Sequence, residues 1–276
     1  MNLMALDSLP GDSTGPHGSF ERKLEGVKAA GFHGVQFATL ASERELSCCR
    51  SLDLSASASG RINSPEEAPE FAAKVADGGY DCATLHVGWG LEDDAEAGRL
   101  LESVLAASGR LRVLLYIETH RATIFQDMWR TVSFLRRYPE IRINGDFSHW
   151  YTGQEMVYGG FEKKLAFIQP VLDRVRFIHG RIGNPGCMQV RVDPDDAEQP
   201  IYVGHFKQLW TRAFSSFVRG AEPGESICFA PELLSPDIFY ARTFNGAEES
   251  DRWQQSLLLK RIAEECFTHA QASTLG

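Results

Sequence analysis

Eight short apolar stretches alternate with helix-forming stretches along the chain, and this alternation constrains the fold more than any other feature. The apolar stretches have the length and the β-forming residues of buried strands. The expected strands are residues 2–6, 34–37, 54–59, 82–87, 113–118, 141–146, 175–179 and 226–232. The expected helices are residues 20–30, 41–51, 64–79, 93–108, 123–137, 161–172, 203–218 and 247–270.

Strands that alternate with helices form parallel sheets. Eight such units without a linker predict closure into one α/β domain over residues 1–276, a single (β/α)8 TIM barrel. The alternative is an open, doubly wound sheet, which eight strands also build. A dinucleotide-binding sheet would carry a glycine-rich phosphate turn, and neither that motif nor a Walker lysine motif occurs here. Ser64 is the expected N-cap of the third helix, with Pro65 at its first position.

The charge balance narrows the choice of partners. Acidic residues outnumber basic ones, 37 against 28, for a net charge of −9. This balance disfavours nucleic acid and anionic membranes as partners, since both require clustered Lys and Arg. No stretch approaches the ~18–20 apolar residues of a membrane span, and residues 1–7 do not have the pattern of a signal peptide. The six cysteines are dispersed without a C-x-x-C pair, which indicates reduced thiols and a cytoplasmic location.

The last four expected strands end in residue types that bind metals or transfer protons. These are Glu118 and His120, Asp146 and His149, His179 and Arg181, and Glu232. Barrel enzymes place their active sites at the C-terminal ends of the strands, so we expect the four ends to meet. Any one of these residues alone is as well explained by a helix cap or a solvated loop. Their recurrence on four consecutive strands is what indicates a site.

Three carboxylates at one buried mouth would repel one another and raise each other's pKa values, and a cation relieves that conflict. An oxygen-rich set with a single imidazole suits Mn²⁺, Mg²⁺ or Co²⁺, and Zn²⁺ is also compatible. The sequence therefore predicts one divalent metal ion. The predicted ligands are Glu118, Asp146, His179 and Glu232.

The motifs at these ends are Glu118-Thr-His120, Asp146-Phe-Ser-His149, His179-Gly-Arg181 and Pro231-Glu232. Together they resemble those of the xylose isomerase-like barrel superfamily, the sugar phosphate isomerases and epimerases, over nearly the whole chain. The resemblance implies one divalent ion on the four predicted ligands, with Mn²⁺ the most favoured, and a homo-oligomer. It also implies that His149 and Arg181 contact substrate oxygens. Glu118 and Glu232 would be both metal ligands and the acid/base pair that exchanges a proton across the substrate carbon.

The expected function follows from that chemistry. A metal that grips a carbonyl and the adjacent hydroxyl stabilises an enediolate as the α-proton leaves. One carboxylate takes the proton and the other returns it. We therefore expect an isomerase or epimerase that acts on a sugar or a related polyhydroxy carbonyl compound. Further candidate substrate contacts near the strand ends are His86, Trp89 and Trp150, for which packing at the barrel mouth is the alternative.

Three other functions stay open. Glu118-Thr-His120 resembles the Glu-x-His of 3-dehydroshikimate and inosose dehydratases, in which His120 would be a catalytic group in proton transfer. An abasic-site endonuclease would need more histidine ligands and a basic groove, and a non-catalytic sugar-binding barrel would have no reason to keep both glutamates. The 183–200 loop is a candidate cover for the site. Only Arg181 and Arg191 are candidate anion ligands, which favours an unphosphorylated substrate.

Overall fold

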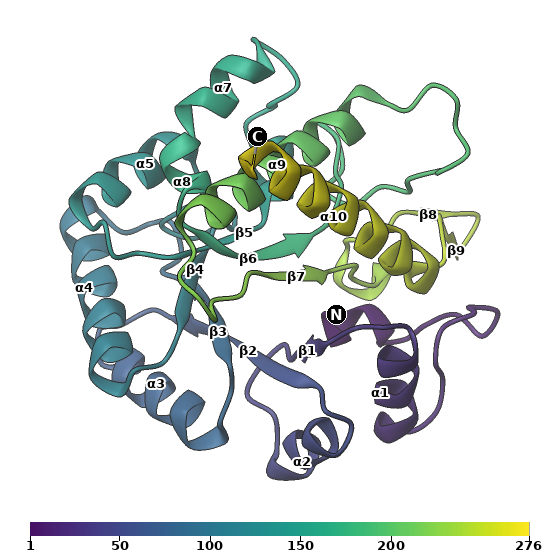
Figure 1. Cartoon of the computed structure of the whole chain (residues 1–276), viewed down its shortest axis with the longest axis horizontal. Coiled ribbons are helices and arrows are strands. Elements are labelled where there is room, and N and C mark those ends of the chain that lie inside the picture. Colours follow the sequence, from purple (N-terminus) through teal and green to yellow (C-terminus); the bar gives the residue numbers. More distant parts are fainter. Residues whose placement is uncertain (276) are drawn as a thin grey trace.

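A computed structural model describes residues 1–275 of the chain. Seven parallel strands form one sheet in the order of the sequence, and each strand pairs with the next (Figure 1). The strands are β1 (Gly34–Gln36), β2 (Ser55–Ile62), β3 (Cys82–Val87), β4 (Leu115–Glu118), β5 (Ile143–Gly145), β6 (Val175–Gly180) and β7 (Cys228–Pro231). The sheet curves into a nearly closed barrel, as the alternating pattern predicted.

The gap between β7 and β1 is filled by the first two residues. Asn2 forms a parallel bridge with Gln36, and its backbone N–H donates to the carbonyl of Pro231 at 3.1 Å. The expected strand over residues 2–6 is wrong, because Leu3–Leu6 is a 3-10 helix, η1. The side chain of Asn2 caps that helix by accepting from the N–H of Met4, which turns the chain out of the sheet.

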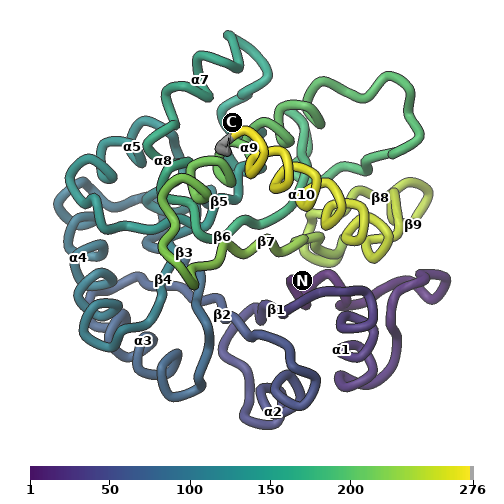
Figure 2. The backbone as a smooth tube through the Cα atoms, in the orientation of Figure 1, coloured from purple at the N-terminus to yellow at the C-terminus, as the bar shows by residue number. Residues whose placement is uncertain are grey.

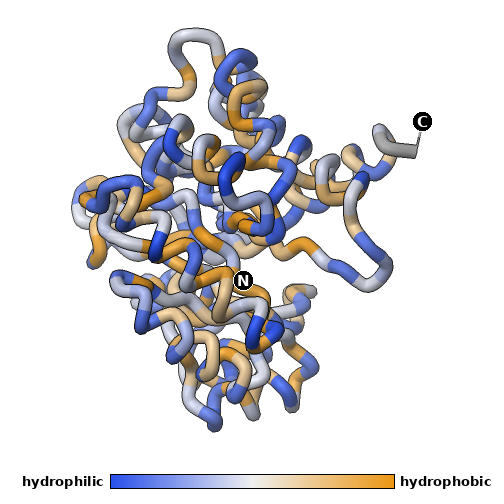
Figure 3. The backbone as a smooth tube through the Cα atoms, turned by 90° about the vertical axis from the view of Figure 1, so that its left-hand side faces the viewer, coloured by the Kyte–Doolittle hydropathy of each residue, from blue (hydrophilic) through white to orange (hydrophobic). Residues whose placement is uncertain are grey.

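Helices surround the barrel and bury one face each against it (Figure 2). Hydrophobic and hydrophilic residues are interspersed along them, as helices with one buried face require (Figure 3). They are α1 (Phe20–Ala29), α2 (Glu43–Ser51), α3 (Glu67–Gly78), α4 (Asp94–Leu111), α5 (Met128–Arg137), α6 (Phe147–Gly153), α7 (Phe161–Phe167), α8 (Gln169–Leu172), α9 (Ile201–Gly220) and α10 (Arg252–Leu275). No helix in the described part of the chain is long and apolar enough to cross a membrane.

Three predicted helix starts are wrong for local reasons. Helix α10 begins at Arg252, five residues later than expected, because Ala247–Glu248 is a short strand, β9. The carboxylate of Glu67 accepts the N–H groups of Asn63 and Ser64 at 2.7 and 3.4 Å, so Ser64 stands in a turn before α3 and does not cap it. Helix α5 begins at Met128, five residues later than expected, because Asp127 caps it through the N–H of Arg130 at 2.7 Å. Several short elements were not expected: α6, the 3-10 helix η2 (Pro236–Ile238), and the hairpin of β8 (Thr243–Phe244) and β9 (Ala247–Glu248).

Candidate metal and active site

The four predicted ligands lie at the carboxyl ends of consecutive strands, where the fold brings them together. Glu118 ends β4, Asp146 follows β5 and caps α6, His179 lies near the end of β6, and Glu232 follows β7. All four are buried, with exposed fractions of 2%, 0%, 3% and 9%. Parallel strands in register deliver their C-terminal residues to one edge, which is why residues distant in sequence share this space.

His179 is the centre of the cluster. Its Nδ1 atom lies 3.3 Å from Glu118 Oε2, 3.9 Å from Asp146 Oδ2 and 3.4 Å from Glu232 Oε2. Its other nitrogen, Nε2, lies 2.9 Å from Oε1 of Gln36, and a neutral ring that donates there has a bare Nδ1 that can bind a metal ion. Without an ion, a proton on Nδ1 supplies the positive charge that the three carboxylates favour. Burial alone lowers the pKa of His179, but the carboxylates of Glu232, Glu118 and Asp146 raise it to about 9.

The donor set fits a divalent cation. Oxygen and nitrogen ligands bind such ions at about 2.0–2.2 Å, which places neighbouring ligand atoms about 3 Å apart. The distances from His179 Nδ1 to Glu118 and Glu232, 3.3 and 3.4 Å, are close to that value, and the distance to Asp146, 3.9 Å, is longer. Three carboxylates and the guanidinium of Arg181 sum to a charge of −2, which one divalent ion neutralises. The bond from His179 to Gln36 is the outer hydrogen bond that orients metal-binding histidines in proteins.

Arg181 is the buried cation of the cluster, with an exposed fraction of 1%. Its Nη2 contacts Asp146 Oδ2 and lies 3.1 Å from Glu232 Oε2, and its Nε donates to Ser148 Oγ at 3.1 Å. Its Nη1 has no hydrogen-bond partner among the described residues. Burial alone would raise the pKa of Asp146, but Arg181 and His149 hold it well below its usual range. Arg181 thus pairs with two carboxylates and keeps one donor for another ligand.

The two glutamates have different environments. Glu118 Oε2 accepts from Asn144 Nδ2 at 3.0 Å, and Glu118 Oε1 lies 3.3 Å from His86 Nε2. Burial favours the neutral acid, but His179 and His86 outweigh it and lower the pKa of Glu118. Glu232 Oε1 accepts from Asn2 Nδ2 at 3.0 Å, and there burial dominates and raises the pKa. A carboxyl group with a lowered pKa and one with a raised pKa are suited to opposite roles in proton transfer.

Three histidines stack beside the carboxylates. The ring of His120 lies between those of His86 and His149, with centroids 4.1 and 3.9 Å away. Burial, followed by the neighbouring His149, lowers the pKa of His120 to about 3, so its ring is neutral at physiological pH. His149 is 2% exposed, and its Nε2 lies 3.3 Å from Asp146 Oδ2, which leaves its Nδ1 without a partner among the residues described. His120 Nδ1 contacts the carbonyl of Arg121, so one nitrogen of each ring remains for a ligand.

His86 is poorly suited to bind a second metal ion, although His86, Glu118 and His120 offer ligand atoms within 4.8 Å of one another. Nη2 of Arg61 lies 3.2 Å from His86 Nδ1. Since a guanidinium only donates, Nδ1 accepts and the proton lies on Nε2, which faces Glu118. A protonated nitrogen is not a metal ligand. The pair instead places a donor on Glu118.

The other residues predicted to contact the substrate, and the candidate anion ligand Arg191, lie in different parts of the structure. Trp89 is 53% exposed, with the guanidinium of Arg61 3.9 Å from its ring centre, so it stands at the mouth. Trp150 is fully buried in the core, and its indole N–H donates to the carbonyl of Phe125 at 2.9 Å. We therefore leave Trp150 out of the substrate site. Arg191 is also elsewhere, since its Nη2 lies 2.7 Å from Asp193 Oδ2 within the 183–200 loop.

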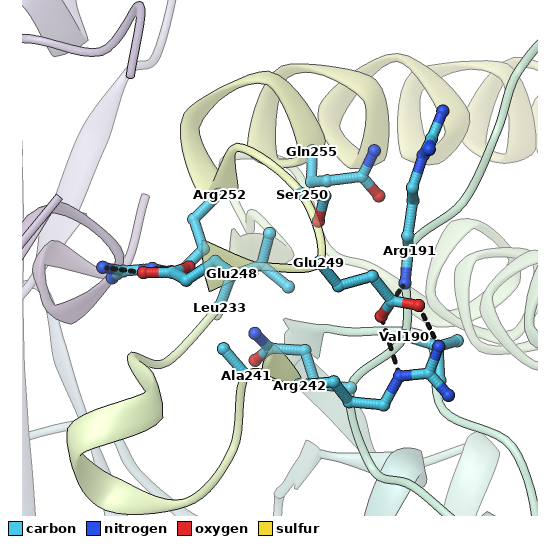
Figure 4. A pocket seen from close by; sticks show the side chains of 11 residues that line it. Val190, Arg191, Leu233, Ala241, Arg242, Glu248, Glu249, Ser250, Arg252 and Gln255 are labelled. Atoms are coloured by element: carbon cyan, nitrogen blue, oxygen red, sulfur yellow. Dashed lines mark hydrogen bonds and ion pairs between the residues drawn. The ribbon is translucent and has the colours of Figure 1, made fainter. Parts of the chain in front are cut away.

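The 183–200 loop is fastened to the segment before α10, not left free over the site. The N–H of Arg191 donates to Glu249 Oε2 at 3.1 Å, and Glu249 also accepts from Arg242 (Figure 4). Gln189 bonds both the N–H and the carbonyl of Leu234. The hollow between these segments holds about 10 Å³, room for a single water molecule, so it is not a substrate site.

Sequence reasoning missed several residues of the site. Asn144 and Gln36 are polar side chains in otherwise apolar strands, and that exception was a readable signal. Arg61 was missed because β2 runs to Ile62, beyond the end of the expected strand 54–59. Arg121 and Tyr240 had no such signal, because each lies on a segment whose course depends on tertiary packing. Asn2 was missed because residues 2–6 were expected to be an ordinary strand.

Comparison with known proteins gives structural matches only, since no family model matches the sequence and no curated protein is similar to it. L-ribulose 3-epimerase superposes with a TM-score of 0.61 at 11% identity, over 99% of this chain and 95% of that one. The probable 3-DHS dehydratase AsbF of Bacillus anthracis has a TM-score of 0.58 at 13% identity, over 86% of this chain and 93% of that one. D-psicose 3-epimerase has a TM-score of 0.56 at 13% identity, over 91% of this chain and 94% of that one. The matches show that the chain shares the barrel fold of these proteins.

Proposed function

We propose that the protein is a divalent-metal-dependent isomerase or epimerase that moves a proton at the carbon next to a carbonyl in a sugar-like substrate. One observation carries this proposal: two buried glutamates, Glu118 and Glu232, flank His179 Nδ1 at 3.3 and 3.4 Å. A divalent ion held by Glu118, Asp146, His179 and Glu232 would polarise the substrate carbonyl and its neighbouring hydroxyl. Mn²⁺ is the ion that we propose for this oxygen-rich set.

The side chains of the chain supply the rest of the chemistry. One glutamate removes the α-proton and the other returns it from the opposite face. Asn144 and Asn2 each donate to one of these carboxylates at 3.0 Å and hold them in place. His149 Nδ1 and Arg181 Nη1, which have no partner among the described residues, are suited to hold substrate hydroxyls. The burial of the whole set keeps water away from the carbanion-like intermediate.

The similar structures support the proposal at the level of reaction type. Two of them are named 3-epimerases, of L-ribulose and of D-psicose. At 11–13% identity the likeness concerns the fold alone, so the assignment to this chain rests on its own glutamates.

A dehydratase is the second candidate, favoured by a specific observation at His120. This neutral ring lies between His86 and His149, and His86, Glu118 and His120 offer ligand atoms within 4.8 Å of one another. A neutral ring so placed could accept the α-proton from Glu118 and pass a proton on to the departing hydroxyl, which leaves as water. The match to a probable 3-DHS dehydratase supports the same reading.

The two candidates are separated by following solvent deuterium. We expect the wild-type protein with Mn²⁺ in D₂O to place deuterium in a ketose without losing water. Glu118→Gln and Glu232→Gln should each abolish the exchange, while Glu25→Gln, on the exposed face of α1, should not change it. Loss of water from 3-dehydroshikimate, abolished by His120→Asn, would select the dehydratase. Absence of both reactions with every divalent ion would reject the catalytic assignment.

A further inference from the structure

Tyr240 lies between two guanidinium groups next to the candidate metal site. Its ring centre is 4.8 Å from Cζ of Arg181 and 5.3 Å from Cζ of Arg121. Both distances are those of cation–π contacts. Arg181 in turn lies 3.1 Å from Glu232. The second guanidinium, that of Arg121, is therefore one aromatic ring away from the carboxylate cluster.

The backbone around Tyr240 is fixed in this position. Phe239 has a left-handed conformation, with φ of 67°, and its side chain is 94% exposed. A bulky residue is strained in that region, and such strain persists only where the surroundings hold it. On the other side of Tyr240, Arg242 Nε donates to Glu249 Oε2 at 2.9 Å (Figure 4). The turn at Phe239 points its own ring to solvent and leaves Tyr240 inside, against Arg181.

The two guanidiniums differ in how their charge is compensated. Arg181 pairs with Asp146 and Glu232. Arg121 is exposed, and among the described residues its guanidinium has neither an ion pair nor a hydrogen bond, only the ring of Tyr240. A divalent ion would neutralise the carboxylate cluster and would leave the charge of Arg121 in excess. Guanidiniums bind carboxylate and phosphate groups with paired hydrogen bonds, more readily than they bind neutral hydroxyls.

We propose that Arg121, with Tyr240 as its wall, binds an anionic group on the substrate, a carboxylate or a phosphate, at the end away from the reacting carbonyl. This inference rests on the proposed function, because the cluster beside it must hold the carbonyl end. The sequence favoured an unphosphorylated substrate because Arg181 and Arg191 were the only candidate anion ligands that it indicated. The structure places Arg191 with Asp193, away from the cluster, and brings Arg121 to its edge.

Three ketoses with one carbon skeleton test the proposal: D-fructose, D-fructuronate and D-fructose 6-phosphate. Their dissociation constants are measured by calorimetry on the full chain with Mn²⁺ supplied. We expect at least one of the two anionic ketoses to bind about tenfold more tightly than D-fructose. Arg121→Ala should remove that preference, so that the three ketoses bind with similar affinity, and Arg121→Lys should restore part of it. Arg110→Ala, on the exposed surface of α4, is the matched control.

Each outcome decides the matter. The anion that gains affinity identifies the group as carboxylate or phosphate. Equal affinity for the three ketoses, no measurable binding of either anion, or a preference that survives Arg121→Ala would overturn the proposal. The proposed reaction fails separately: a preference that depends on Arg121, without deuterium exchange into any ketose, would leave the anion subsite standing and reject the isomerase.

Discussion

At the scale of single residues, Asn144 shows how closely the site is balanced in charge. Its amide donates to Glu118 at 3.0 Å and lies 3.2 Å from His179 Nδ1, in a position with no exposure. Asn144→Asp would add a fourth buried carboxylate and lose that donor. We expect the metal-free variant to lose about 3 kcal/mol of unfolding free energy, as when a buried charge lacks its partner. Chemical denaturation with a chelator present measures the loss.

Asn144→Leu is the control for that substitution, because it removes the donor without adding charge. A buried hydrogen bond of this kind is worth about 1–3 kcal/mol, and its loss should be the same with and without a divalent ion. The deficit of Asn144→Asp should shrink when the ion is added. Equal deficits in both conditions would show that no cation binds near Asn144.

At the scale of elements, Asp251 joins the start of α10 to the loop before α1. Its carboxylate accepts from the N–H of Trp253 at 2.9 Å, from Ser13 Oγ at 2.8 Å and from the N–H of Thr14 at 2.9 Å. Burial alone would raise the pKa of Asp251, but these donors outweigh it and lower the pKa. A lowered pKa in the folded state means that the stabilisation is present above the unfolded-state value, about 3.9, and is lost as the pH falls through the folded value.

We therefore expect Asp251→Ala to lose about 1 kcal/mol of unfolding free energy near pH 7, as helix N-caps do. The difference from the wild-type protein should shrink between pH 7 and strongly acidic solution, as the pH falls through the lowered folded-state pKa and the carboxylate becomes protonated in both states. Urea unfolding at the two pH values measures it. Asp12→Ala, at an exposed position of the same loop, should be neutral at both. A deficit that persists in acid would mean that the hydrogen bonds do not depend on the charge.

The elements also show which features the sequence could predict. Strands β3 to β7 were placed within a few residues because a buried parallel strand is a continuous apolar run, and the site followed because each run ends in Glu, Asp or His. Helix α6 and the segment with Tyr240 were missed. Helix α6 starts from Asp146 itself, whose Oδ1 accepts the N–H of Ser148 at 3.1 Å, so one carboxylate serves both cap and site. The position of Tyr240 depends on Arg181 and Arg121, which only the folded chain brings together.

At the scale of the whole molecule, the residues of the candidate site connect the C-terminal ends of the barrel strands to one another. Glu118, Asp146, His179 and Glu232 come from β4, β5, β6 and β7, and Asn2 links Glu232 to β1 through Gln36. Without a cation, three carboxylates oppose this closure. A bound ion would therefore stabilise the arrangement of four of the seven barrel strands, and the affinity for the ion would be coupled to global folding.

An ion that binds only the folded chain raises its stability by about 2.7 kcal/mol at a hundredfold excess over the dissociation constant. We expect Mn²⁺ to raise the melting temperature of the chelator-treated wild-type protein and to leave that of the Asp146→Asn/His179→Ala variant unchanged. The control His33→Ala/Asp53→Asn alters the same residue types at exposed positions and should keep the full response. Thermal unfolding across a Mn²⁺ titration, repeated with Mg²⁺, Co²⁺ and Zn²⁺, then ranks the ions. If none of these ions stabilises the wild-type protein, the metal site is rejected. The three carboxylates would then be compensated by Arg181, by a protonated His179 and by protonation of one carboxylate.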